Sequence, residues 1–170
     1  MKLIESLKQI KDLQRKADDL RVKVSKHSAY LSNETPVYPN QQNIVEGWIQ
    51  AHSDILKEIL RLRIAIQRTN LSTMVTVKLD DKDVTKSIAE WVHRRRDLAK
   101  GEEAMWRMLT DRNLKEGHLP QSTGQPIEVK IVRCYNPLTR DKMLSLYQSE
   151  PSTIDAKLEI ANALTSLLEE

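Results

Sequence analysis

Residues 43–69, NIVEGWIQAHSDILKEILRLRIAIQRT, decide the fold of this chain. One stripe of side chains recurs in this stretch at alternating steps of three and four residues, which is the spacing of a coiled-coil seam. The members of this seam are Val45, Trp48, His52, Ile55, Ile59, Leu62 and Ile66. At 1.5 Å per residue the predicted helix is about 40 Å long, and we expect Asn43 to be its N-cap.

A second long helix is predicted at about residues 2–27, because apolar residues again recur at three- and four-residue steps. They are Leu3, Leu7, Ile10, Leu13, Ala17, Leu20 and Val24. Pro36 and Pro39 prevent the intervening segment from continuing the helix, so it is a loop. Two such helices joined by a loop form an antiparallel hairpin.

The composition agrees with a mainly α fold. Of 170 residues, 30% are charged and 39% hydrophobic, with four glycines and no phenylalanine. This length suits one compact domain, residues 1–170. A net charge of +3 produces no strong field, so the charge does not favour nucleic acid as a partner.

The single cysteine, Cys134, excludes an intramolecular disulfide and fits a reducing compartment. The N-terminal residues alternate charge with Leu and Ile, unlike a signal peptide. No segment approaches the roughly 20 apolar residues needed to cross a bilayer. We therefore expect a cytoplasmic protein, or a virion part assembled in the cytoplasm, with no membrane partner.

A small β element is predicted after the hairpin. TMVTVKL (residues 73–79) is rich in β-branched residues, and DDKD (residues 80–83) reads as a turn. IEVKIVRC (residues 127–134) alternates between apolar and polar side chains like a strand, so we expect it to pair with residues 73–79. Thr85 is predicted to cap a third helix that reaches about Arg112, followed by a loop over residues 113–126.

The last helix is predicted to start at Asn136-Pro137, where an N-cap precedes proline at the first helical position. We expect the helix to be interrupted or kinked at Glu150-Pro151 and to resume behind Ser152, with Asp155 three residues on as in a capping box. The predicted fold is thus about four helices with a two-stranded β element. Its parts are a helical hairpin (1–70), a β element with the third helix (71–134) and a C-terminal helix (135–170).

Catalytic motifs are absent from the sequence. It holds no glycine-rich phosphate loop, no nucleophile elbow and no pair of closely spaced histidines. Glu90 and His93 form half of a di-iron motif, which requires a second copy and two further glutamates. Glu102-Glu103 lacks the other acids of a metal cluster. We expect no catalytic residue, no metal site and no cofactor.

The stretch WVHRRRDLAK (residues 91–100) places three arginines on a helix that also carries apolar residues. At 100° per residue they cannot all face one direction, so at least one guanidinium, that of Arg95 or Arg96, is drawn toward the core or an interface. A guanidinium there needs a carboxylate or an anionic ligand. One interpretation is an internal ion pair, with Asp97 or with an acid on another helix.

The other interpretation is a pocket for a phosphate-bearing ligand, since arginines beside a helix N-terminus suit phosphate. Its candidate residues are Arg95, Arg96, Arg133, Tyr135 and Arg140.

Other residues are candidates for holding an interface or a helix register. Trp48, His52 and Trp91 lie on apolar stripes and are expected to be core or interface anchors. The spacing Asn-x-x-Thr occurs twice, at Asn70 and at Asn162 with Thr165. Asn70 is interpreted as a helix stop, and Thr73 as the start of the strand. Asn162 sits in a segment that still looks helical, so we expect its amide to bond across elements or subunits.

The order of features resembles the septicolysin-like family of small helical bacterial and phage proteins. The segments that carry the resemblance are MKLIESL, DLQRKADDLR, NETPVYP, the RTN at 68–70, DVTKSIAEWVHRRRDL and IDAKLEIANALTSL. The resemblance implies a helical hairpin with a small β insertion and self-association. It implies no agreed activity, and the name points to membrane lysis.

Three functions follow as expectations. The first is a non-enzymatic helical protein that works by self-association, as a homo-oligomer, or by contact with a protein partner. The second is an anion- or nucleotide-binding module built on the arginines. The third, membrane lysis, rests on the family name alone.

Overall fold

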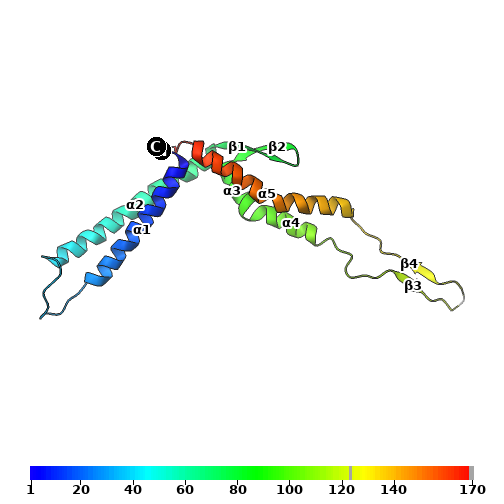
Figure 1. Ribbon diagram of the computed structural model, residues 1–170, viewed down its shortest axis with the longest axis horizontal. Helices are drawn as coiled ribbons and strands as arrows, with labels where there is room; N and C mark the ends of the chain where they lie inside the picture. Colours follow the sequence, from blue (N-terminus) through cyan, green and yellow to red (C-terminus); the bar gives the residue numbers. More distant parts are fainter. Residues whose placement is uncertain (123, 169–170) are drawn as a thin grey trace. The chain divides into compact units, whose positions relative to one another are not determined.

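The computed structural model describes residues 1–122 and 124–168, and the predicted mainly α fold with a small antiparallel β part is confirmed. The elements, shown in Figure 1, are α1 (Leu3–His27), α2 (Gln41–Ser72), β1 (Met74–Leu79), β2 (Lys82–Ser87), α3 (Ile88–His93), the π-helical turn η1 (Arg94–Leu98), α4 (Ala99–Arg107), β3 (Gly117–Leu119), β4 (Ile127–Val129) and α5 (Pro137–Leu164). None of the helices formed by these residues is both long and apolar enough to cross a bilayer.

The chain divides into two compact units. The first contains Met1–Met74, Ser87–Ala89 and the segment from Glu159 onward, and the second contains Val75–Lys86 and Glu90–Leu158. The single domain expected from the length stays a prediction, since two compact units can unfold together or separately.

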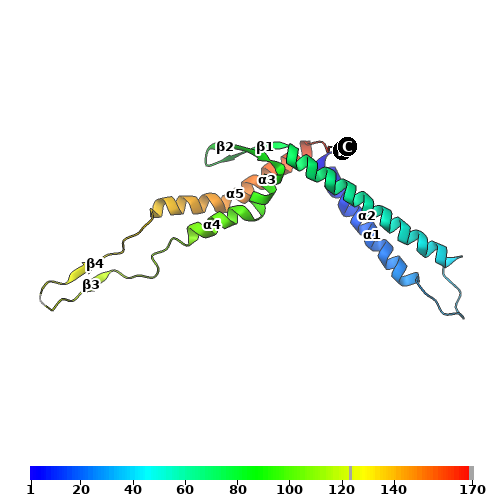
Figure 2. The same cartoon turned by 180° about the vertical axis from the view of Figure 1, so that it is seen from behind.

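The first unit is built on the predicted hairpin. Helices α1 and α2 lie side by side and run in opposite directions in both views (Figures 1 and 2). The expected N-cap Asn43 is wrong, because α2 begins at Gln41 behind Asn40, which has a left-handed backbone (φ 53°). Gln41 fixes this turn: its Oε1 accepts the Val37 N–H at 3.1 Å, and its Nε2 donates to the His27 carbonyl at 2.9 Å.

The other end of the hairpin is closed by both termini of the chain. The Leu3 N–H donates to the Thr165 carbonyl at 3.0 Å, and the Leu167 N–H donates to the Met1 carbonyl at 2.8 Å. The Leu168 N–H donates to the hydroxyl of Thr69 at 2.9 Å, and that hydroxyl donates to the Ala65 carbonyl at 2.8 Å. Leu3 and Thr69 are fully buried, and residues 165–168 bond both the N-terminal residues and α2.

In the second unit, strand β1 pairs with β2 rather than with residues 127–134, so that predicted pairing is wrong. Asp80 and Asp81 both adopt positive φ (46° and 61°), as a two-residue hairpin turn of the primed type requires. Closing this short loop costs far less chain entropy than joining strands some 50 residues apart. Thr85 therefore lies in β2 and caps no helix; its hydroxyl bonds that of Thr76 at 2.7 Å.

The third predicted helix is shorter and less regular than expected. It begins at Ile88, passes through the π-helical turn η1 and ends at Arg107 rather than Arg112. Trp91 is fully buried, and its indole N–H donates to the Val75 carbonyl at 2.8 Å. Trp91 is thus a core anchor that joins the helix to β1.

A second ribbon forms from Gly117–Leu119 and Ile127–Val129, where a loop followed by a long strand was predicted. Strands β3 and β4 pair antiparallel with His118 opposite Glu128, and every residue of both strands is exposed. Of the strand predicted at 127–134, only Ile127–Val129 forms.

Helix α5 begins as predicted, because the Asn136 side chain accepts the Leu138 N–H at 2.9 Å. The interruption predicted as one alternative at Glu150-Pro151 is wrong, since Pro151 lies inside one continuous helix. The other alternative, a kink at this position, stays a prediction. Buried Ile154 and Leu158 follow Pro151, and their packing outweighs the lost hydrogen bond. Ser152 lies within this helix, and its hydroxyl donates to the Ser149 carbonyl at 2.8 Å.

We predict that Thr69→Val destabilises the protein by about 1–2 kcal/mol, because Val keeps the shape of the fully buried Thr69 but removes the hydroxyl that accepts the Leu168 N–H. Urea unfolding gives the loss, and amide exchange should quicken at Leu168. Ser72→Ala is the matched control, since the Ser72 hydroxyl is exposed and bonds the Arg68 carbonyl of its own helix. Equal losses in the two variants would contradict the prediction.

Candidate functional site

The arginine most drawn into the structure is Arg94. Its guanidinium forms two hydrogen bonds with the Glu150 carboxylate, Nε–Oε1 at 2.5 Å and Nη2–Oε2 at 3.0 Å. The Glu150 side chain is only 2% exposed and that of Arg94 22%. Hydrogen bonding to Glu150 raises the pKa of Arg94 above its usual value. The guanidinium also lies 5.5 Å from the ring centre of Tyr147, within cation–π range.

Arg95 and Arg96, the predicted inward-facing arginines, are more exposed than Arg94. Arg95 pairs with Asp155 on α5, so Asp155 serves an ion pair instead of the predicted capping box. Arg96 donates to its neighbour Asp97 at 3.1 Å. A helical wheel with 100° steps missed Arg94 because these residues form a π-helical turn, which shifts side chains relative to an α-helix.

The remaining predicted anion-binding residues do meet in the structure, around Asp111. Arg133 binds both Asp111 carboxylate oxygens, at 2.7 and 2.6 Å, and the Tyr135 hydroxyl donates to Oδ1 at 3.1 Å. Arg140 donates to the Leu109 carbonyl at 3.0 Å and contacts the Tyr135 hydroxyl at 3.3 Å. Sequence reasoning missed Asp111, which follows the third helix without any motif.

The charges around Asp111 favour the ion pairs that Arg133 and Arg140 already make. The hydrogen bond from Arg133 holds the pKa of Asp111 below its usual value, and the same bond raises the pKa of Arg133. Arg140 has a second acid, Asp141, at 2.9 Å. A phosphate could bind here only by displacing a carboxylate.

The described His, Cys, Asp and Glu side chains form no metal-binding cluster. Within residues 1–122 and 124–168, no three His, Cys, Asp or Glu side chains lie close enough to share a metal ion. Glu103 instead pairs with Arg107, at 2.9 Å, and accepts from Gln148 at 3.2 Å, and these bonds lower its pKa.

Trp48 lies in an aromatic cluster at the loop end of the hairpin. Its ring centre is 5.5 Å from that of Tyr38 and 5.7 Å from that of His27, and His27 and Tyr38 are 5.1 Å apart. The Tyr38 ring meets both others edge-on, a favourable arrangement of aromatic rings. The cluster fastens the loop onto α1 and α2.

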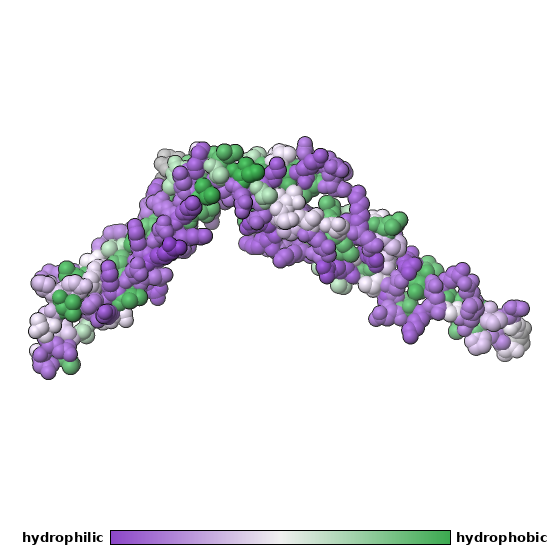
Figure 3. All heavy atoms as spheres, viewed as in Figure 1, coloured by the Kyte–Doolittle hydropathy of each residue, from purple (hydrophilic) through white to green (hydrophobic). Residues whose placement is uncertain are grey.

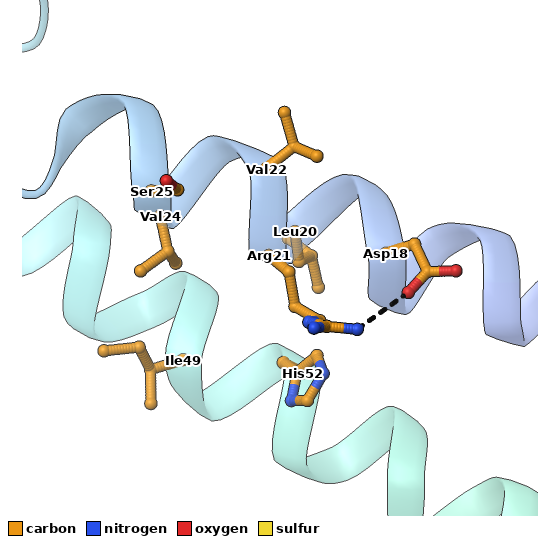
Figure 4. Close-up of a pocket in the computed structure, with 8 residues that line it drawn as sticks. All are labelled: Asp18, Leu20, Arg21, Val22, Val24, Ser25, Ile49 and His52. Atoms are coloured by element: carbon orange, nitrogen blue, oxygen red, sulfur yellow. Dashed lines mark hydrogen bonds and ion pairs between the residues drawn. The ribbon is translucent and has the colours of Figure 1, made fainter.

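His52 lines an open groove of about 610 Å³ along the hairpin. Figure 4 shows Leu20 and Val24 of α1 facing Ile49 and His52 of α2 across this groove. The Arg21 guanidinium also points toward α2 and bonds Asp18 of its own helix at 3.2 Å. The groove is largely apolar and carries no convergent set of polar groups.

The two Asn-x-x-Thr sequences mark equivalent helix ends. Helices α2 and α5 end at Ser72 and Leu164, each two residues beyond the Asn. Thr73 and Thr165 then follow directly, and each donates its N–H to the carbonyl four residues earlier, at 2.9 and 2.8 Å. The interpretation of Asn70 as the stop residue is wrong, and the segment after Asn162, which was expected to stay helical, leaves the helix after Leu164.

The two asparagines are half-buried side chains of the final helical turns. The Oδ1 atom of Asn70 is buried, and among the described residues it has no hydrogen-bond partner. Thr165 also accepts the Leu3 N–H through its carbonyl, so this helix end helps to fix the N-terminus.

Comparisons with known proteins bear on the fold alone. No protein-family model matches the sequence, and neither does any curated protein. A similar solved structure is that of a functionally unknown conserved protein from Corynebacterium diphtheriae, with a TM-score of 0.58 and 19% identity over 99% of each chain. The resemblance to the septicolysin-like family stays a prediction.

We predict that Arg94→Met destabilises the protein by about 3–5 kcal/mol, because it leaves Glu150 buried and charged without a partner. Arg96→Met, which removes an exposed pair, should cost less than about 1 kcal/mol. Adding Glu150→Leu to Arg94→Met should restore most of the loss, which urea unfolding measures. A double variant no more stable than Arg94→Met would contradict this view of the pair.

Proposed function

We propose that this chain is a non-enzymatic helical protein that acts through self-association and protein–protein contacts. The observation that carries the proposal is the incomplete burial of the α1/α2 hairpin. Within residues 18–58, all of which the structure describes, Gln41 is the one buried residue. The seam in this half of the hairpin is therefore only half covered.

The same half of the hairpin also exposes large aliphatic side chains. Val22 is 66% exposed, Ile49 55% and Leu56 49%, and Figure 3 shows apolar residues reaching the hairpin surface. Burying apolar surface stabilises by roughly 25 cal/mol per Å², so a contact that covers this face is favourable. Apolar patches of this kind on a protein surface mark interaction sites.

The absence of a catalytic motif in the sequence agrees with this proposal, and the septicolysin-like resemblance, which implies self-association, points the same way. The lone cysteine favours action in the cytoplasm or in a virion assembled there.

We expect light scattering of the full chain to give a mass above 19.6 kDa, the mass of one copy, that rises toward a multiple of it with concentration. Because the proposed contact is apolar, raising the salt concentration to about 1 M should not dissociate it. A constant mass of 19.6 kDa up to millimolar protein would overturn the proposal.

The second candidate is an anion-binding module, favoured by the convergence of Arg133, Tyr135 and Arg140. It ranks behind self-association because Asp111 already occupies the centre of the group.

Thermal unfolding with inorganic phosphate, nucleotides and cyclic dinucleotides separates the two functions. We expect no rise in the melting temperature with any of these ligands. A rise that Arg133→Ala abolishes, and that the control Arg15→Ala on α1 leaves intact, would favour the anion-binding module.

A further inference from the structure

Helix α2 carries a second line of aliphatic side chains, which diverges from the seam that faces α1 toward the C-terminal end of the helix. Five residues belong to it, each between 39% and 68% exposed: Ile49, Leu56, Leu60, Ile64 and Leu71. At 100° per residue they fall within about 80° of the helix circumference. The line is about 33 Å long at 1.5 Å per residue. We call it the outer stripe.

The spacing of the outer stripe is symmetric about Leu60. Ile49 and Leu71 are each eleven residues from Leu60, and Leu56 and Ile64 are each four residues from it. Two exposed polar residues on the same line, Ser53 and Gln67, are each seven residues from Leu60.

This symmetry fits a two-fold, antiparallel pair of α2 helices. In an interface of that kind, if residue i contacts residue j of the other copy, then j contacts i. With Leu60 on the two-fold axis, Ile49 meets Leu71, Leu56 meets Ile64, and the polar pair meet each other. We infer that the outer stripe binds a second copy of this chain, in the antiparallel register that places Leu60 opposite Leu60. The inference rests on the proposed function and names its surface.

Two cations near the centre of the stripe, Lys57 and Arg61, are neutralised within α2. Lys57 lies 3.0 Å from Asp54, and Arg61 binds both oxygens of Glu58, at 2.9 and 2.8 Å. Lys57 and Arg61 therefore bring no unpaired charge to the approach of a second copy.

The size of the stripe sets the strength of the contact. A strip about 33 Å long and about 10 Å wide covers roughly 350 Å² of each copy, below the area of a standard stable interface. The dimer is therefore reversible and forms in a concentration-dependent way.

Distances between spin labels test the register. Ser53→Cys, Gln67→Cys and Lys57→Cys are made singly in a Cys134→Ser background, because Cys134 is exposed. In the antiparallel register, labels at positions 53 and 67 give the same separation, about 21 Å along the helix axis, and labels at 57 give about 9 Å. A parallel pair would give about 10 Å at all three positions.

The variant Leu60→Asp tests the surface itself. Leu60 is 59% exposed, so the chain should fold with unchanged helicity by circular dichroism. Two carboxylates meeting on an apolar axis should raise the dimer dissociation constant by about a hundredfold or more. Leu138→Asp is the control, since Leu138 is 80% exposed and lies on α5; its dissociation constant should not change.

The outcomes separate the two proposals. Matched distances at positions 53 and 67 and a weakened Leu60→Asp dimer support the outer stripe. A dimer that lacks the matched distances, or that Leu60→Asp leaves intact, overturns the stripe while the proposed function stands. A mass of 19.6 kDa at every concentration overturns both.

Discussion

Two antiparallel helices share one seam, so each of them can bury only one stripe of side chains. Most features of the first unit follow from this constraint. Because this area is small, α1 and α2 are also fastened at their ends. The aromatic cluster of His27, Tyr38 and Trp48 closes the loop end, and the hydroxyl of Thr69 joins the C-terminal segment to the other end.

The second unit also has a small apolar core, and it buries an ion pair in addition. Its helices bury Trp91, Ala99, Ile154 and Leu158, but they also bury Glu150 against Arg94. A buried ion pair of this kind adds little net stability, yet breaking it is costly. Arg94 and Arg95 thus join η1 to α5 through carboxylates of the chain itself, whereas Arg96 pairs with Asp97 within the turn.

Regular patterns were predictable from the sequence, and features set by a single turn were not. The seam of α2 and the N-cap Asn136 follow from local spacing. The turn at Asp80-Asp81 lacks glycine, so nothing in the sequence required both residues to adopt positive φ. Pro151 normally breaks a helix, and only the packing of its neighbours overrides that preference. Arg94 was missed because a π-helical turn changes the angular step on which helix faces are assigned.

The two stripes of α2 have different repeats, and this difference explains where the hairpin is open. The inner seam repeats every seven residues and the outer stripe every eleven, so they drift in opposite directions around a helix of 3.6 residues per turn. At 100° per residue they are about 80° apart near Ile49 and about 160° apart near Leu71. Close to Leu71 the stripes face opposite sides of α2. Near Ile49 they merge into one broad apolar face, wider than α1 alone can cover, and the groove beside His52 lies there.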